Sequence, residues 1–139
     1  MLAPKAPVDA DRMTCTMRRL LTIGLAALAG LTAWFLLAEA AGLDLIARTP
    51  TSTSRVGPFA VVMAALIAGF AGWGLLALLE RVSSGPARTI WTVIAAAVLL
   101  LSLLGPLGGV GAAAVMGLMC LHLVVGLVLI AGLPRPATR

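Results

Sequence analysis

Four long apolar runs, separated by short polar segments, are the feature that most constrains this chain. They cover about residues 20–41, 56–79, 89–105 and 110–133, and the third run is the shortest. An α-helix needs roughly 20 predominantly apolar residues to cross the hydrocarbon core of a bilayer. Because the four runs occupy most of the 139 residues, no separate soluble domain has room to fold.

The runs predict helices and not strands. Each is continuously apolar and rich in Ala and Leu, without the alternation of apolar and polar residues that is typical of a barrel strand. Backbone groups inside hydrocarbon must pair within their own segment, which a helix achieves. With 61% hydrophobic residues, 11% charged residues and a mean hydropathy of +1.11, a soluble class is excluded. We predict an all-α membrane protein, an antiparallel four-helix transmembrane bundle.

The basic residues predict the orientation of the bundle. Eight of the ten Lys and Arg residues lie in the tail 1–19, the connection 81–88 and the tail 134–139, on one side of the four runs. Only Arg48 and Arg55 lie on the other side. Since cytoplasmic loops are enriched in Lys and Arg, both termini are expected in the cytoplasm. The net charge of +5 thus indicates membrane orientation and not nucleic-acid binding.

The start of the chain also resembles a signal peptide. Arg18 and Arg19 precede the first apolar run, and the small residues around Glu39 resemble a cleavage site. The apolar core of a signal peptide has about 7 to 15 residues, fewer than this run, so the first run is predicted to remain as a span. Three methionines are candidate start sites: Met1, Met13 and Met17.

The connections differ in length and composition. Residues 42–48 of the first connection mix apolar and charged residues, and they are expected to lie along the membrane interface. Asp44 and Arg48 are four residues apart, which on a helix places acid ahead of base in the favourable order. The polar stretch 49–54 is predicted to be irregular, whereas residues 105–109, with Gly and Pro, predict a tight turn between the last two helices.

Small residues at four-residue spacing predict the faces on which the helices pack. In hydrocarbon, helices associate mainly where small residues let their backbones approach closely. Trp34 and Trp91 lie near the ends of spans and are predicted to anchor them at the interface. The spaced small residues are Ala26 and Gly30, Ala29 and Ala33, Ala65 and Gly69, Ala68 and Gly72, and Gly109, Ala113 and Gly117.

His122 is the main candidate for a functional residue, because it lies midway along the fourth run, where ionisable groups are costly. One interpretation is a neutral structural histidine, bonded to a backbone carbonyl or to Thr32 or Ser102. A metal or haem ligand is the alternative. Met119 shares the helix face of His122, but Cys120 is about 160° away, and the chain has no second histidine. We therefore assign no cofactor and no metal.

Glu39, Asp44 and Arg48 are the remaining polar candidates. A proton-coupled exporter needs a carboxylate near the membrane midplane, whereas Glu39 lies near the outer boundary of the first span. We expect it to pair with Arg48 or Arg55, or to be solvated at the interface. No hydrolase elbow, phosphate-binding loop or pair of intramembrane carboxylates is present, so no catalytic residue is assigned and enzymatic activity is not expected.

Several segments together resemble a known family. They are residues 42–48 after the first run, 72–81 closing the second, 101–106 closing the third and 122–126 in the fourth. In combination they resemble small four-span bacterial membrane proteins of unknown function, typical of high-GC, actinobacterial-type genomes. The resemblance implies the fold and the membrane location and supplies no activity.

The sequence favours a non-enzymatic structural or accessory subunit of a larger membrane assembly, because the spans carry packing faces and little polar machinery. The alternative is an oligomeric transporter or channel component with a polar path near His122. A haem- or metal-binding electron-transfer subunit is a third interpretation. The expected partners are the lipid bilayer and either a larger membrane protein or further copies of this chain.

Overall fold

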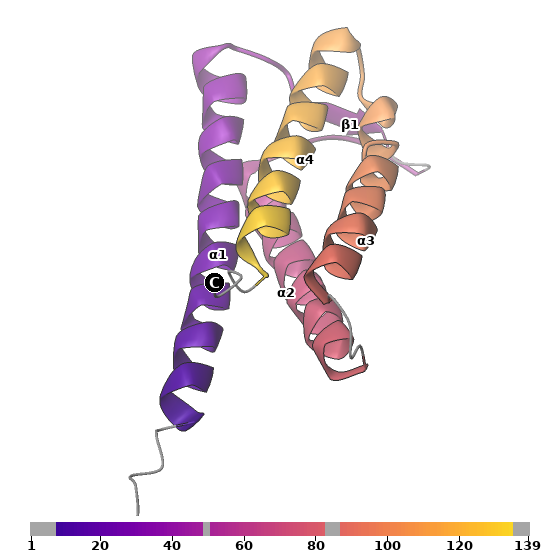
Figure 1. Cartoon of the computed structure of the whole chain (residues 1–139). Coiled ribbons are helices and arrows are strands. Elements are labelled where there is room, and N and C mark those ends of the chain that lie inside the picture. The colour runs from indigo at the N-terminus through magenta and orange to yellow at the C-terminus, as the bar shows by residue number, and fades with distance from the viewer. Residues whose placement is uncertain (1–7, 49–50, 83–86, 135–139) are drawn as a thin grey trace, which may run out of the picture.

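The structure, a computed structural model, describes residues 8–48, 51–82 and 87–134. Four long helices dominate these residues (Figure 1). They contribute to four stretches that are long and apolar enough to cross a membrane, Met13–Ala40, Pro58–Val82, Arg88–Gly108 and Ala112–Gly132, which confirms the prediction of four candidate spans. The helices are α1 (Val8–Phe35), α2 (Pro58–Val82), α3 (Ala87–Ser102) and α4 (Ala112–Gly132).

The helix boundaries follow from local sequence. α1 begins at Val8, before the first apolar run, and continues into a π-helical turn, Leu36–Ala40. α2 begins at Pro58, and proline fits a first helical turn because its missing N–H has no helical partner there. α3 is the shortest of the four helices, and a 3-10 turn at Gly105–Gly108 follows it. Gly111, with φ of 91°, precedes α4 in a conformation that favours glycine.

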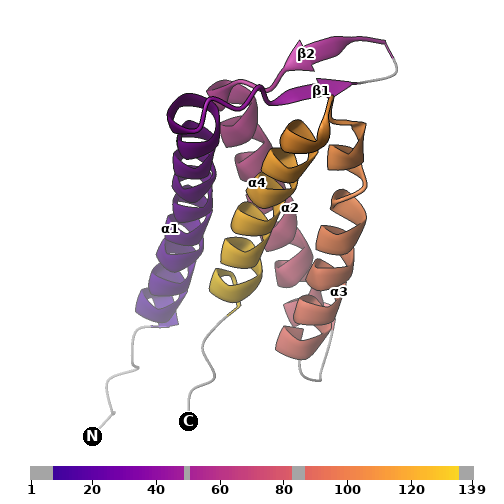
Figure 2. The same ribbon diagram turned by 90° about the horizontal axis from the view of Figure 1, so that it is seen from above.

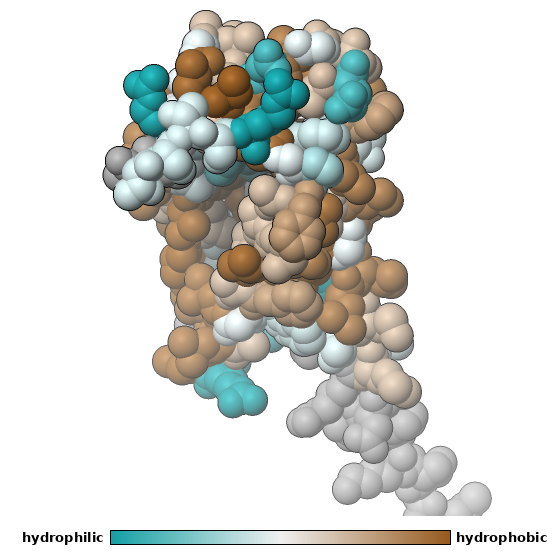
Figure 3. Space-filling model, turned by 180° about the vertical axis from the view of Figure 1, so that it is seen from behind, coloured by the Kyte–Doolittle hydropathy of each residue, from teal (hydrophilic) through white to brown (hydrophobic). Residues whose placement is uncertain are grey.

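The four helices lie side by side and alternate in direction (Figure 2). A short β-hairpin and the turn between α3 and α4 lie at one end, called the hairpin end here. The start of α1, the end of α2, the start of α3 and the end of α4 lie at the other, the terminal end. α1 packs most closely against α2 and α4, while α3 makes fewer contacts with α2 and α4. Apolar side chains cover the middle of the molecule between hydrophilic residues at both ends (Figure 3).

Two apolar clusters hold the helices together, one in each half of the molecule. The cluster toward the terminal end joins all four helices and includes Ile23, Ala26, Leu76, Trp91, Leu129 and Leu133. The cluster toward the hairpin end consists of Leu45, Val61, Leu118 and Leu121. Trp91 is only 3% exposed, and its indole N–H donates to the carbonyl of Ile130 at 3.4 Å. The prediction that Trp91 anchors the interface is therefore wrong, because its ring packs inside the protein against α2 and α4.

Glycines mark the closest approaches between helices. A Cβ built on Gly69 would lie 2.8 Å from Ile23 Cγ2, and one on Gly30 would lie 2.8 Å from Val125 Cγ2. A Cβ on Gly117 would lie 2.5 Å from Leu45 Cδ2. Since Gly30, Gly69 and Gly117 belong to the predicted small-residue faces, those positions lie where the chain packs tightly.

The first connection contains a β-hairpin, so Thr53 and Ser54, expected in an irregular stretch, lie in a strand instead, while residues 49 and 50 of that stretch lie outside the described residues. The expectation that residues 42–48 lie along the membrane interface stays a prediction. β1 (Ile46–Arg48) pairs antiparallel with β2 (Thr53–Arg55), with Ile46 opposite Arg55. The other edge of β1 meets the turn between α3 and α4, where the N–H of Val110 donates to the carbonyl of Ile46 at 3.0 Å. Pairing on both edges gives the backbone groups of β1 hydrogen-bond partners in two other segments. In a helix, these groups would have paired within their own segment. The all-α class thus holds for the spans and not for this connection.

The close contact at Gly69 makes a prediction about stability. Gly69→Ala is expected to destabilise the fold by about 1–3 kcal/mol, because the new methyl group overlaps Ile23, which is 1% exposed. The matched control is Gly74→Ala on the same helix, where a Cβ meets nothing within 4 Å. Thermal unfolding in detergent measures the difference. Equal melting temperatures for both variants would contradict the packing at this site.

Candidate functional site

His122 lies at the middle of α4, and its ring is held by its own helix. Nδ1 is 2.9 Å from the backbone carbonyl of Leu118, one turn earlier. A carbonyl oxygen only accepts, so Nδ1 carries the proton and donates it. In the neutral ring the other nitrogen, Nε2, is then an acceptor. The prediction of a backbone carbonyl as partner is confirmed.

Neither hydroxyl that was considered as a partner bonds to His122. The hydroxyl of Ser102 donates to the carbonyl of Leu99 at 2.7 Å, within α3. The hydroxyl of Thr32 donates to the carbonyl of Leu28 at 2.9 Å, within α1. Each hydroxyl thus satisfies its donor inside its own helix, as serine and threonine commonly do in spans. Ser102 nevertheless lies near His122, because both line the same cavity.

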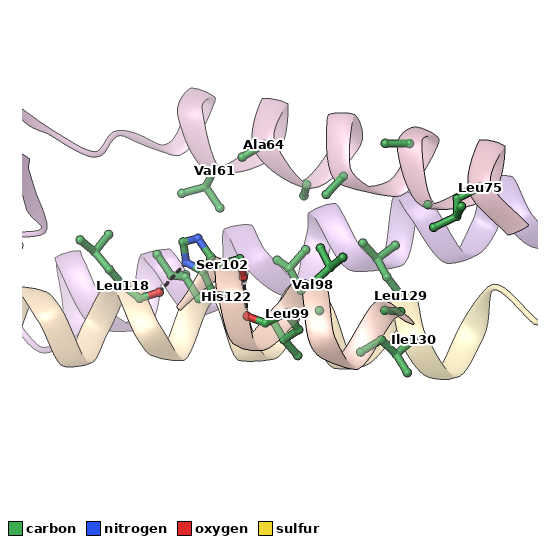
Figure 4. A pocket seen from close by; sticks show the side chains of 18 of the residues that line it. Val61, Ala64, Leu75, Val98, Leu99, Ser102, Leu118, His122, Leu129 and Ile130 are labelled. Carbon is green, nitrogen blue, oxygen red and sulfur yellow. Dashed lines mark hydrogen bonds between the residues drawn. The ribbon is translucent and has the colours of Figure 1, made fainter. Parts of the chain in front are cut away.

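The cavity that contains His122 lies between α2 on one side and α3 and α4 on the other (Figure 4). Its volume is about 590 Å³. His122 and Ser102 are the polar side chains among its described lining residues, apart from the indole of Trp91. The apolar lining includes Val61, Ala64, Ala68 and Leu75 from α2, Val98 and Leu99 from α3, and Leu118, Val125 and Leu129 from α4. We call this space the His122 cavity.

The residues weighed as metal ligands are not gathered at this site. Cys120 is exposed and does not line the His122 cavity. Met119 is half-buried and does not line the His122 cavity. Within the described ranges, no three His, Cys, Asp or Glu side chains are grouped closely enough to hold a metal ion.

The structure places Glu39, Asp44 and Arg48 at the hairpin end, away from His122. Glu39 lies exposed in the π-helical turn, and no ion pair involves it among the described residues. Arg55 Nη2 instead donates to Asp44 Oδ1 at 2.6 Å. The expected helical spacing of Asp44 and Arg48 is therefore wrong, because Arg48 lies in β1 and the hairpin brings Arg55 back to Asp44. Both side chains of this pair are exposed, so it contributes little stability.

Arg19 and Glu80 form an ion pair that the sequence analysis missed. Arg19 Nη2 donates to Glu80 Oε1 at 2.5 Å, which ties α1 to α2 at the terminal end. The Arg19 side chain is only 7% exposed, and its Nε is buried without a hydrogen-bond partner in the described part of the chain. In the sequence, Arg19 serves only as one of the positive charges that predict the membrane orientation. An acid and a base at the same end of two successive spans are the sequence feature that indicates this ion pair.

Thr22 adds a second polar tie beside this pair. Its hydroxyl lies 3.0 Å from the carbonyl of Arg18 and 3.2 Å from the carbonyl of Gly132 on α4. The methyl group of Thr22 fills the space that a side chain at position 132 would need. Arg19 and Thr22 therefore connect α1 to both of the helices that it contacts most.

The comparisons with known proteins identify the family of this chain. A family model described as a family of unknown function (DUF6069) matches residues 10–139. The chain belongs to that family. No curated protein and no solved structure matches this chain.

The buried ion pair predicts a measurable loss of stability. Glu80→Gln is expected to lower the free energy of unfolding by roughly 2–4 kcal/mol, because it leaves the guanidinium of Arg19 buried without a counter-charge. Glu39→Gln makes the same chemical change at an exposed position that forms no ion pair with the described residues, so it is expected to change stability by about 0.5 kcal/mol or less. Melting temperatures in detergent compare the two. A loss no larger for Glu80→Gln than for Glu39→Gln would mean that the pair does not stabilise the fold.

Proposed function

We propose that this chain is a four-helix bundle of a bacterial inner membrane, with both termini in the cytoplasm, and that it acts as a non-enzymatic accessory subunit of a larger membrane protein. The membrane placement is supported by the four apolar helices and by the apolar surface between two hydrophilic ends.

The distribution of charge at the two ends supports the orientation. The terminal end carries exposed Arg18, Arg81 and Arg88, and further basic residues of the sequence lie outside the described ranges. At the hairpin end, the bases Arg48 and Arg55 are offset by nearby acids. The terminal end is therefore the more basic one and is assigned to the cytoplasm.

The packing of α3 is the observation that supports the accessory role. Only 11% of the most apolar stretch around α3 is buried, against 28% for α1 and for α4. Lipid supplies no hydrophobic force between helices, so a span is held mainly by its packing contacts. α3 is thus the helix with most unmatched surface, including Val93, Leu100 and Leu101. A helix of a larger partner that packs on this face would supply the contacts that α3 lacks within its own chain.

A transporter or channel component is the second candidate, and the position of His122 beside a cavity favours it. The lining is mostly apolar, so a polar path would need side chains from further copies of the chain. The accessory role requires no such path and is the simpler proposal.

Cysteine labelling tests the orientation. In a background of Cys15→Ser and Cys120→Ser, Ser54→Cys in β2 and Arg88→Cys at the start of α3 form a matched pair of exposed positions. A membrane-impermeant maleimide is expected to label Ser54→Cys in intact cells and Arg88→Cys only after the cells are broken. The reverse pattern would place the termini outside the cytoplasm.

Site-specific cross-linking tests the accessory role. A photoreactive amino acid at Leu101, 65% exposed on α3, is expected to yield one discrete adduct with a larger membrane protein. The control is Leu28 on α1, 59% exposed, where only lipid adducts are expected. Lipid adducts alone at Leu101, or an adduct of two copies of this chain, would contradict a larger partner at α3.

A further inference from the structure

The His122 cavity has the size and wall chemistry of a small-molecule site. Its volume of about 590 Å³ falls within the roughly 300–1,000 Å³ that is typical of ligand pockets. Such pockets are predominantly apolar with a few polar groups that fix the orientation of the ligand. Here the apolar walls come from three helices, and the polar groups are gathered where His122 and Ser102 lie (Figure 4).

The cavity is open to the hydrocarbon layer along α2. Ala60, Ala64 and Ala68 line it and are also exposed at the surface of the chain. Their small side chains leave the wall between α2 and α3 incomplete. A molecule dissolved among the lipid tails can thus reach His122 from the side, without passing through either hydrophilic end.

Nε2 of His122 is an acceptor without a partner among the described residues. Nδ1 donates the ring proton to the carbonyl of Leu118. Figure 4 shows the ring directed toward α2, near Val61 and Ala64. No hydrogen bond to Nε2 is present within the described ranges. Nε2 is also not one of the described side-chain atoms that are both fully buried and without a hydrogen-bond partner. An unmatched acceptor in an apolar setting costs free energy, so a donor that enters the cavity is stabilised there.

The hydroxyl of Ser102, the other polar group in the lining, has no free hydrogen-bond donor either. The hydroxyl hydrogen of Ser102 is used on Leu99, which leaves only lone pairs. Among the described lining residues there is no Lys or Arg to hold an anion and no Asp or Glu to hold a cation. The chemistry of the walls therefore selects a neutral ligand with a hydrogen-bond donor.

We propose that the His122 cavity binds a lipophilic alcohol or phenol, whose hydroxyl donates to Nε2 of His122 while its apolar body lies between α2 and α4. The inference uses the membrane placement of the chain and does not depend on the accessory role. Failure of the cross-linking experiment at α3 would leave it unaffected.

A pair of probes that differ only in the hydroxyl tests the proposal. The probes are dodecanol with a terminal bromine atom and the methyl ether of the same molecule, which cannot donate. Bromine quenches indole fluorescence at short range, and Trp91 lies in the cavity wall. With the full chain in lipid nanodiscs, the alcohol is expected to quench at a concentration about tenfold lower than the ether.

Variants connect that preference to His122. His122→Phe keeps a ring of similar shape without an acceptor, so the alcohol and the ether are expected to bind equally. His122→Gln restores an acceptor and is expected to regain part of the preference. The control Thr32→Val removes a hydroxyl on α1 that does not line the cavity, and the tenfold preference should remain.

The outcomes separate a specific site from ordinary lipid contact. Equal quenching by alcohol and ether in the unaltered chain would overturn the proposal and indicate only partition of the probes into the cavity. Quenching by neither probe would also overturn it. If His122→Phe still prefers the alcohol, the hydroxyl donates to a group other than His122, which contradicts the assignment of Nε2 as the acceptor. If His122→Phe does not fold, His122→Leu, which also removes the acceptor, takes its place.

Discussion

Backbone pairing in hydrocarbon is the constraint on which the rest of this structure depends. Within the four helices each segment satisfies its own N–H and C=O groups. Where a helix stops at the hairpin end, the backbone pairs with other segments instead. The N–H of Val56 donates to the carbonyl of Leu45 at 2.7 Å, and Val110 donates to Ile46. The indole of Trp34 donates to the carbonyl of Val56 at 2.8 Å. These bonds close the hairpin end and place Leu45 against Gly117.

The distribution of glycine explains why the helices do not pack equally. α1, α2 and α4 contain glycines that let a neighbour approach, such as Gly30, Gly69 and Gly117. α3 contains no glycine. Its contacts instead use large side chains, with Trp91 against Gly72 and Leu99 against Gly126. The first contact joins α3 to α2 and the second joins α3 to α4, while the small exposed alanines of α2 leave the space between α2 and α3 open. The loose packing of α3 and the His122 cavity are thus one feature.

The sequence predicted what depends on long segments and not what depends on pairs of distant residues. Four spans and the tight turn before α4 follow from apolar length and from Gly and Pro, which are local properties. The backbone partner of His122 lies one turn away on the same helix, so it was also within reach. The ion pair of Arg19 and Glu80, the burial of Trp91 and the cavity depend on which helices are neighbours. Apolar periodicity carries little of that information, because nearly every face of these spans is apolar. The hairpin was missed for a related reason, since β1 is stabilised partly by a segment far along the chain.

Contacts within the protein account for the other polar side chains of the spans, but they do not account for His122. Thr22 joins α1 to α4, and Arg19 joins α1 to α2, so packing accounts for both. His122 bonds only to its own helix among the described residues, and it adds no polar tie between helices. An apolar residue at this position would avoid the cost of an imidazole in hydrocarbon. The stability of the four helices therefore gives no reason for a histidine here. Nε2 is the ring nitrogen without a hydrogen-bond partner among the described residues, and the proposed alcohol or phenol in the cavity would give it one.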